Sequence, residues 1–374
     1  MDWSTVRAEF PVTRQWAFFD HAAVSPLPAR TAAVLREFAD DMSAGGSTRV
    51  RAWVDRAEAT RSSIAKLVGG DPRGIALVKN TTEAIGFVAE GYPWKPGDNV
   101  VLPADEYPSN QYPWLNLESR GVSVRRVPPR GNRVELSDLR DTCDHRTRMI
   151  AVSFVGYASG FRVDVAALVQ LARERNAHLM VDAIQGLGVL PFDLQQTPID
   201  FVACGSHKWL LGPQGAGFLY IRPHLIDMLH PMEVGAASVM AGFDYSRIEF
   251  ELKPTAARWE GGTTNFGGFA AFGASIDLLL GTPGIPDRVR HLTGTLCTRA
   301  ECAGLKIFSS RSGYDWSGIV SFDLGSRDVA AAVKRCRDAG IVVSNRGGRL
   351  RAAPHIYNSE DEIDRLIGAI SQPE

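Results

Sequence analysis

The chain has 374 residues, of which 45% are apolar and 22% charged, with a formal net charge of −1. This length favours one large domain plus a smaller one, and the charge lacks the basic footprint of a nucleic-acid-binding protein. No apolar run approaches the ~18 residues of a membrane span, and the first ten residues carry no signal-peptide core. The five scattered cysteines form no C-x-x-C pair. We therefore expect a reducing, cytoplasmic setting with no nucleic-acid or membrane partner.

Short apolar runs alternate with helical-period segments from about residue 74 to 223. This alternation predicts an α/β sheet, mainly parallel and covered on both faces. The expected strands are Ile75–Val78, Asn99–Pro103, Val122–Val127, Met149–Phe154, His178–Asp182, Phe201–Cys204 and Gly217–Ile221. Asp164–Asn176 is an expected helix between two of them, and residues 225–260 are expected to be irregular.

The pattern changes after the expected helix Gly267–Leu280, where the run GTPGIP (281–286) predicts a break. The elements expected beyond it are strands Gly318–Asp323, Ile341–Ser344 and Arg349–Ala352 and helices Arg327–Ala339 and Ser359–Ile370. These form a small α+β unit. We therefore predict a large α/β domain at 14–280 and a small C-terminal α+β domain at 281–374, with residues 1–13 packing on the small one.

Two polar residues stand where expected strands end. Asp182 closes one apolar strand, and Lys208 follows another 26 residues later, in a chain with only seven lysines among 41 basic residues. Ligands of open α/β sheets bind at such strand ends, and a buried lysine can lose its proton. Pyridoxal phosphate (PLP) requires a lysine for its Schiff base and an acid opposite its ring nitrogen. The alternative is that Asp182 caps a turn and Lys208 lies on the surface, but SHKW and GPQGAG around Lys208 favour PLP.

The stretch KNTTEAIG predicts a helix start. Asn80 is an expected cap, Glu83 completes an expected capping box, and Thr81 and Thr82 fall in the first turn. Free N–H groups and the helix dipole suit a phosphate there, although a capped helix without a ligand has the same pattern. No G-x-G-x-x-G or Walker sequence is present and the histidines lack metal spacing, so we expect no nicotinamide or metal site.

These motifs resemble the class V aminotransferase family, a branch of fold-type I PLP enzymes that includes cysteine desulfurases, kynureninases and isopenicillin N epimerase-like proteins. The matching segments, in family order, are FFDHAAVSPLP (18–28), NTTEAI (80–85), VDAIQ (181–185), GSHKWLLGPQG (205–215), EGGTTNFGG (260–268) and RAAPHIYNSEDEID (351–364). The resemblance implies a fold-type I PLP-dependent transferase fold, pyridoxal 5'-phosphate as cofactor, and a homodimer.

The resemblance also implies residue roles. Lys208 would form the Schiff base, Asp182 would pair with the ring nitrogen, and Gln185 would contact the phenolic oxygen. The Thr81 amide and Thr82 would hold the phosphate. The full cofactor-binding set that it implies is Thr81, Thr82, Tyr107, Asp182, Gln185, Ser206, His207, Lys208 and, donated across the dimer, Thr263.

Three positions bear on the substrate and the cofactor ring. Tyr107 takes the place where the family often stacks a histidine on the ring, which keeps an aromatic face. Phe154 stands where cysteine desulfurases carry an asparagine. Arg351 resembles the clamp for the substrate carboxylate, a role that Arg346 or Arg349 could also take.

The reaction type stays open at this point. Cysteine desulfurases need a mobile cysteine shortly before the clamp, and the interval 341–351 has none; the nearest, Cys336, falls in an expected helix. We therefore predict that the protein is not a standard cysteine desulfurase. Transamination of a small α-amino acid is the nominal expectation, because it needs only Lys208, the cofactor and the clamp. A C–S or C–Se lyase, an epimerase and a degenerate binding protein are the alternatives, and we expect loops 43–53 and 232–250 to set selectivity.

Overall fold

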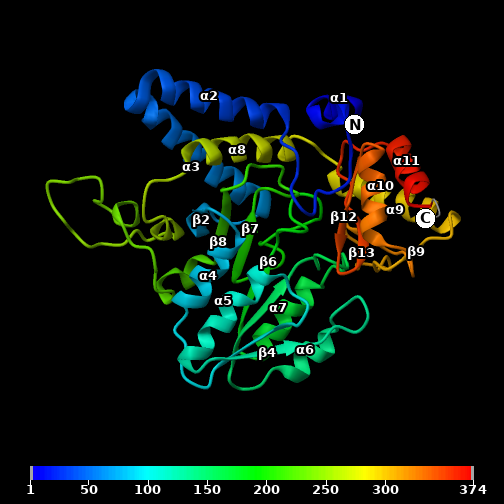
Figure 1. The fold of residues 1–374 in the computed structure, drawn as a ribbon. Helices are drawn as coiled ribbons and strands as arrows, with labels where there is room; N and C mark the ends of the chain where they lie inside the picture. Colours follow the sequence, from blue (N-terminus) through cyan, green and yellow to red (C-terminus); the bar gives the residue numbers. More distant parts are fainter. Residues whose placement is uncertain (1–2, 372–374) are drawn as a thin grey trace.

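The computed structural model describes residues 3–371, and its centre is a seven-stranded sheet of order β2-β8-β7-β6-β5-β3-β4. The strands are β2 (Ile75–Val78), β3 (Asn99–Pro103), β4 (Ser123–Val127), β5 (Thr147–Ser153), β6 (His178–Asp182), β7 (Phe201–Gly205) and β8 (Gly217–Ile221). Only β8 runs antiparallel to its neighbours. The predicted mainly parallel α/β sheet is therefore confirmed, with each strand within two residues of its expected bounds (Figure 1).

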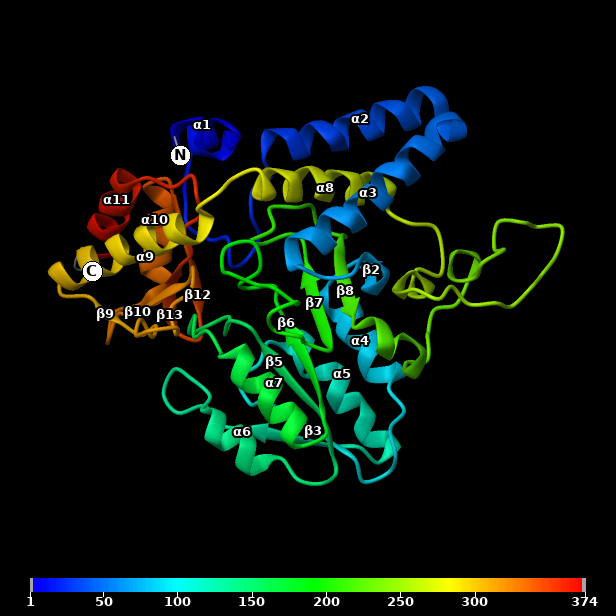
Figure 2. The ribbon, with the colours of Figure 1, turned by 180° about the vertical axis from the view of Figure 1, so that it is seen from behind.

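Helices cover both faces of this sheet (Figures 1 and 2). One face packs against α3 (Val50–Val68), α6 (Leu136–Thr142), α7 (Val165–Glu174) and α8 (Phe266–Leu280). The other packs against α4 (Thr81–Gly91) and α5 (Tyr112–Leu115). Alternate residues of a strand enter the two cores: Val181 lies in the first and Met180 in the second. Burial on both faces explains why these strands are continuous apolar runs.

Three helices of 17 or more residues were not predicted. α2 (Ala29–Gly45) and α3 are joined by a short 3-10 turn at Gly46–Arg49. The expected loop at 43–53 is therefore wrong, because only this turn separates the two helices. α9 (Ile285–Cys302) begins inside the segment expected to be a break. Pro286 lies in the first turn of α9, where a missing N–H costs nothing because it would have no intrahelical partner.

The C-terminal unit is α+β, as predicted. Its antiparallel sheet has the order β12-β13-β10-β9. The elements are β9 (Lys306–Ile307), β10 (Val320–Asp323), β12 (Ser344–Arg346), β13 (Arg349–Ala352), α9, α10 (Val329–Asp338) and α11 (Glu360–Ser371). A capping box begins α11, because Ser359 and Glu362 exchange hydrogen bonds between side chain and backbone.

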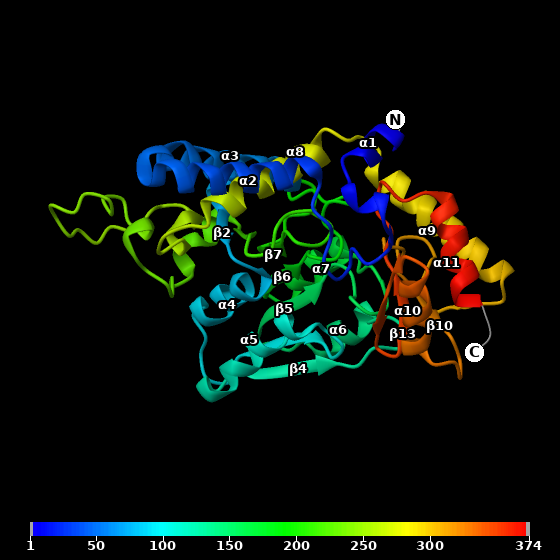
Figure 3. The ribbon, with the colours of Figure 1, turned by 45° about the horizontal axis from the view of Figure 1, so that its top comes forward.

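The N-terminal segment belongs with this unit. In α1 (Trp3–Ala8), Arg7 donates to the Tyr357 carbonyl and to Glu362. β1 (Ala17–Phe18) pairs in parallel with β11 (Ile341–Val342). The expected domain boundary at residue 14 would place β1 in the large domain, whereas this strand pairs with one of the C-terminal unit. Figure 3 shows α1 beside α9 and α11.

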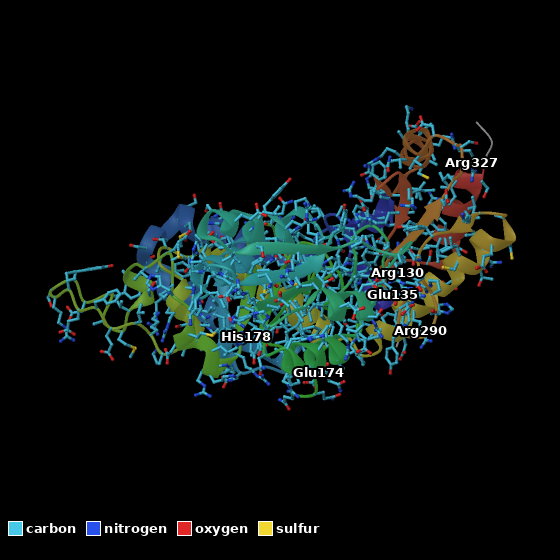
Figure 4. The ribbon with its side chains drawn as sticks, turned by 90° about the horizontal axis from the view of Figure 1, so that it is seen from below. Arg130, Glu135, Glu174, His178, Arg290 and Arg327 are labelled. Atoms are coloured by element: carbon cyan, nitrogen blue, oxygen red, sulfur yellow. The ribbon has the colours of Figure 1, made fainter. Side chains whose placement is uncertain are left out.

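The molecule is elongated (Figure 4), with the C-terminal unit, which contains the labelled Arg327, at one end and an irregular segment of residues 229–256 at the other. This irregularity was expected from the sequence. Within residues 3–371 no single helix is long and apolar enough to cross a membrane; α8 and α9 pass that test only as a pair bent by 79°. Most residues of α8 are buried in the core.

Candidate active site

A cavity of about 490 Å³ lies at the carboxyl ends of the central strands, between the sheet and the C-terminal unit. The residues that line it are Ala22, Ala23, Val24, Asn80, Thr81, Thr82, Tyr107, Ser109, Tyr157, Asp182, Ile184, Gln185, His207, Lys208, Arg346 and Arg351. Most of the residues singled out from the sequence therefore meet in one place, although they come from segments far apart in the chain.

Asp182 forms the deepest acidic group of the cavity. It is the last residue of β6 and only 2% exposed. Its Oδ1 accepts the N–H of Ile184 at 3.0 Å, while Oδ2 has no hydrogen-bond partner within residues 3–371. Burial raises the pKa of Asp182 to about 6, against the opposing effects of the Ile184 N–H and Lys208. Such a carboxyl is suited to a cationic partner in the cavity.

Lys208 lies on the turn after β7 and is 8% exposed. Burial lowers its pKa to about 8, an effect that Asp182 opposes and that Arg351 and Arg346 reinforce. Its Nζ lies 5.4 Å from the centroid of the Tyr107 ring. His207 is neutral near pH 7, because burial and the Lys208 charge lower its pKa to about 4. The lowered pKa makes more of Lys208 available as the neutral amine, the nucleophilic form, than an exposed lysine would offer.

The start of α4 forms a second wall. Asn80 Oδ1 accepts the N–H of Glu83 at 2.9 Å, so the predicted cap is confirmed. The predicted capping box is wrong by one residue, because the Glu83 carboxylate accepts from the N–H of Lys79 instead of Asn80. The first backbone N–H groups of a helix have no intrahelical partner, and those of Thr81 and Thr82 are the ones at the cavity. This wall could hold a phosphate.

Arg351 extends from β13 and is 1% exposed. Its Nη1 donates to the Tyr157 carbonyl at 2.8 Å and its Nη2 to Asp20 Oδ1 at 3.1 Å, while Nε has no partner among the described residues. Its acidic partner is Asp20, whereas Glu360, which lies nearer in sequence, pairs with Arg288. Arg351 is therefore held in place at the cavity with part of its donor capacity unused.

Some expected residues do not reach the cavity. The Ser206 hydroxyl is fully buried and donates to the Pro213 carbonyl, so it points into its own turn. Phe154 packs against Phe192, and Thr263 is exposed on the surface of this chain. Asp20 and Tyr157 were not expected at the site, although Asp20 lies in the family-like segment 18–28.

Comparison with known proteins identifies the family. The family described as Aminotransferase class-V matches residues 17–366. The chain belongs to the class V aminotransferase family. It is 31% identical, over 96% of its length and 95% of the other protein, to a Methanothermobacter thermautotrophicus protein named "Probable cysteine desulfurase". It is also 31% identical to the isopenicillin N epimerase of Streptomyces clavuligerus, over 83% of this chain and 82% of that protein.

The fold agrees with this family. The structure of a cysteine desulfurase from Thermococcus onnurineus superimposes with a TM-score of 0.89 at 24% identity, covering 98% of this class V chain and 97% of the other. The predicted fold-type I architecture is therefore confirmed, and the protein is a PLP-dependent enzyme, either a transferase or a lyase.

The side chains of the cavity complement the chemical groups of PLP. Asp182 Oδ2 offers an unused acceptor for a protonated ring nitrogen, the start of α4 offers donors for a phosphate, and Lys208 offers an amine of lowered pKa. Tyr107 offers an aromatic face, and it is 44% exposed in the described chain. The carboxylate, the helix start, the amine and the aromatic ring thus each complement a different part of the cofactor.

We predict that borohydride reduction of the PLP-loaded enzyme fixes the cofactor to Lys208. The reason is the lowered pKa of this buried amine, whereas Lys79, the nearest lysine in sequence to the cavity wall, is exposed and paired with Glu83. Peptide mapping locates the label. The Lys79→Arg variant is the control and should be labelled like the unchanged enzyme. A label on any lysine other than Lys208 contradicts the assignment.

We predict that Asp182→Asn stabilises the cofactor-free protein in a pH-dependent way. The folded pKa of about 6 lies above the ordinary 3.8, so the stability that Asp182 contributes is complete below about pH 4 and is lost as the pH rises through about 6. Urea unfolding should show a gain for the variant below roughly 1 kcal/mol near pH 4 that grows to roughly 3 kcal/mol near pH 7.

The matched control is Asp40→Asn, which removes an exposed carboxylate from α2. It should leave the pH dependence of unfolding unchanged. Equal pH slopes for Asp182→Asn and the unchanged protein would mean that Asp182 is not desolvated.

Proposed function

We propose that this enzyme cleaves the C–S bond of a small sulfur-containing α-amino acid and releases the sulfur as a soluble product. The observation that carries the proposal is the composition of the cavity. Lys208, Asp182 and Arg351 line it, and none of the five cysteines, all of which lie within residues 3–371, does so. The protein's relatives include several named cysteine desulfurases, at 27–31% identity.

Each group has a task in this proposal. When bound, PLP supplies an electron sink for the carbanion at Cα. Lys208 carries the cofactor and then, as a neutral amine, takes the Cα proton. Asp182 keeps the proton on the ring nitrogen, and Arg351 holds the substrate carboxylate with a planar fork. Tyr107 covers the ring face.

Sulfur transfer to a protein thiol has no support in this site. Cys336 is fully buried in the C-terminal core, and burial raises its pKa to about 11, so it is not a thiolate near neutral pH. Cys302 is exposed on α9, outside the cavity lining. Sulfide must then leave the enzyme directly. Five free thiols also fit the reducing, cytoplasmic setting that we propose.

Two other reactions use the same three groups. Transamination, the nominal expectation from the sequence, needs an amino acceptor, and epimerisation needs return of the proton to the opposite face. The 31% identity to an isopenicillin N epimerase makes epimerisation the second candidate. C–S cleavage is preferred because most of the named relatives carry that activity in their names.

We predict that the PLP-loaded enzyme converts cysteine and water to pyruvate, ammonia and sulfide in equal amounts without a reductant. No acceptor thiol is needed, so Cys302→Ser should keep the full rate. The products are measured together in one reaction. Alanine with sulfur retained on the protein would overturn the proposal. Formation of 3-mercaptopyruvate, only with an added 2-oxo acid, would indicate a transaminase, and inversion at Cα an epimerase.

We predict that Arg351→Lys raises KM for the amino acid by about 10- to 100-fold and leaves cofactor absorbance intact. Lysine keeps a charge beside Asp20 but loses the two-pronged contact with a carboxylate, worth roughly 1.5–3 kcal/mol. Arg349→Lys is the control, because Arg349 lies two residues away but outside the cavity lining. An equal effect in the control, or loss of PLP, would assign the clamp elsewhere.

We extend the proposal to a homodimer in which Thr263 contributes to the neighbouring cavity. Thr263 is exposed in the single chain and does not line its own cavity. Close by in sequence, residues 239–250 expose several large apolar side chains, namely Met240, Phe243, Tyr245, Ile248 and Phe250. Exposed apolar groups of this density are typical of a contact surface, and a second copy of the chain would cover them.

A further inference from the structure

Gln185 has a side chain that is hydrogen-bonded at both ends. It lies at the cavity, three residues after Asp182, and is 3% exposed. Its Nε2 donates to the Ala22 carbonyl at 2.9 Å, and its Oε1 accepts from the indole Nε1 of Trp209 at 2.9 Å. Trp209 directly follows Lys208. The amide is therefore held between the N-terminal segment and the lysine turn.

These two partners fix which way the amide points. An indole N–H can only donate and a backbone carbonyl can only accept. If the Gln185 amide were reversed, its NH₂ group would face the Trp209 N–H and its oxygen would face the Ala22 carbonyl. Both contacts would become repulsive inside a buried site. Nε2 has a second N–H, and the fixed orientation makes this N–H the donor that Gln185 can offer to the cavity.

The Trp209 side chain is packed so that its indole cannot rotate away from Gln185. It is fully buried, and its carbonyl oxygen accepts from His355 Nε2 at 3.2 Å. Its ring presses against Gly318, where an added Cβ would lie 2.4 Å from the indole Cη2. The indole N–H needs an acceptor, because an unsatisfied buried donor costs roughly 1–3 kcal/mol. Gln185 Oε1 is the acceptor that it has.

We propose that Trp209 is a positioning residue that holds the Gln185 amide with an N–H directed at the phenolic oxygen of PLP, and thereby sets the proton affinity of the linkage between Lys208 and the cofactor. This inference rests on the proposed function, since it takes Lys208 to carry PLP and Gln185 to contact the phenolic oxygen. Trp209 touches neither the cofactor nor the substrate in this proposal.

The direction of the effect follows from electrostatics. A donor at the phenolic oxygen stabilises negative charge there. It therefore lowers the pKa of the proton that this oxygen shares with the Lys208 nitrogen. Without the indole N–H, only the Ala22 carbonyl still fixes the amide of Gln185, so the amide turns its own oxygen toward the cavity more readily. The stabilisation is then lost for part of the time, and the pKa of the linkage rises.

The test is an absorbance titration of the bound cofactor in Trp209→Phe, which keeps an aromatic ring but has no N–H. The pH of the spectral transition should rise by about 0.5 to 1 unit, a fraction of the 1.5–3 kcal/mol expected for a hydrogen bond to a charged oxygen. Trp259→Phe is the matched control. Trp259 is also buried, at 2% exposure, but its Nε1 has no partner within the described chain, so its titration should match the unchanged enzyme.

An unshifted titration in a folded, PLP-bound Trp209→Phe enzyme would overturn the inference, as would an equal shift in Trp259→Phe. If the phenylalanine variant does not fold, benzothienylalanine at position 209 gives the same test, because it keeps the shape of tryptophan and replaces only the N–H by sulfur. A role in packing alone predicts no shift for that isostere. Failure of the unchanged enzyme to bind PLP would instead contradict the proposed function.

Discussion

Asp182 and Lys208 carry opposite charges, line one cavity and are both buried. Burial raises the pKa of Asp182 to about 6 and lowers that of Lys208 to about 8. The charge of each residue shifts the pKa of the other in the opposite direction and so offsets part of the effect of burial. The sheet can impose this arrangement because β6 and β7, whose ends hold the two residues, are buried along almost their whole length. Neither strand can shift to return its polar residue to water. A ligand that carries both a cationic ring nitrogen and a carbonyl group resolves the conflict.

Three distant segments are joined under the cavity by buried hydrogen bonds. His21 Nδ1 lies 2.8 Å from the Ala353 carbonyl and its Nε2 lies 2.7 Å from the Tyr357 hydroxyl. His355 Nε2 meets the Trp209 carbonyl. Burial lowers the pKa of both imidazoles, that of His355 to about 4. Each ring is therefore neutral near pH 7, and the carbonyls identify the protonated nitrogen: Nδ1 in His21 and Nε2 in His355.

The sequence predicted those elements whose local residue pattern directly reflects their burial. Fully buried strands appear as apolar runs, so the strand ends at Asp182 and Lys208 could be found without a structure. The sequence was uninformative where partners are distant, as with Asp20, which lies 331 residues from Arg351. The hydrogen bond of the Ser206 hydroxyl to the Pro213 carbonyl could not be foreseen either, because residue type alone does not reveal which turn a hydroxyl closes. α9 was missed because proline opens a helix as readily as it ends one.

The pairing of β1 with β11 has a consequence for biosynthesis. β11 is synthesised more than 300 residues after β1, and domains generally fold as units during synthesis. Residues 22–24, which form one wall of the cavity, follow β1 directly. The nascent large domain must therefore assemble its sheet with this wall unanchored. The cavity can therefore close only after β11 has been made, so completion of the cofactor pocket depends on a strand far along the chain.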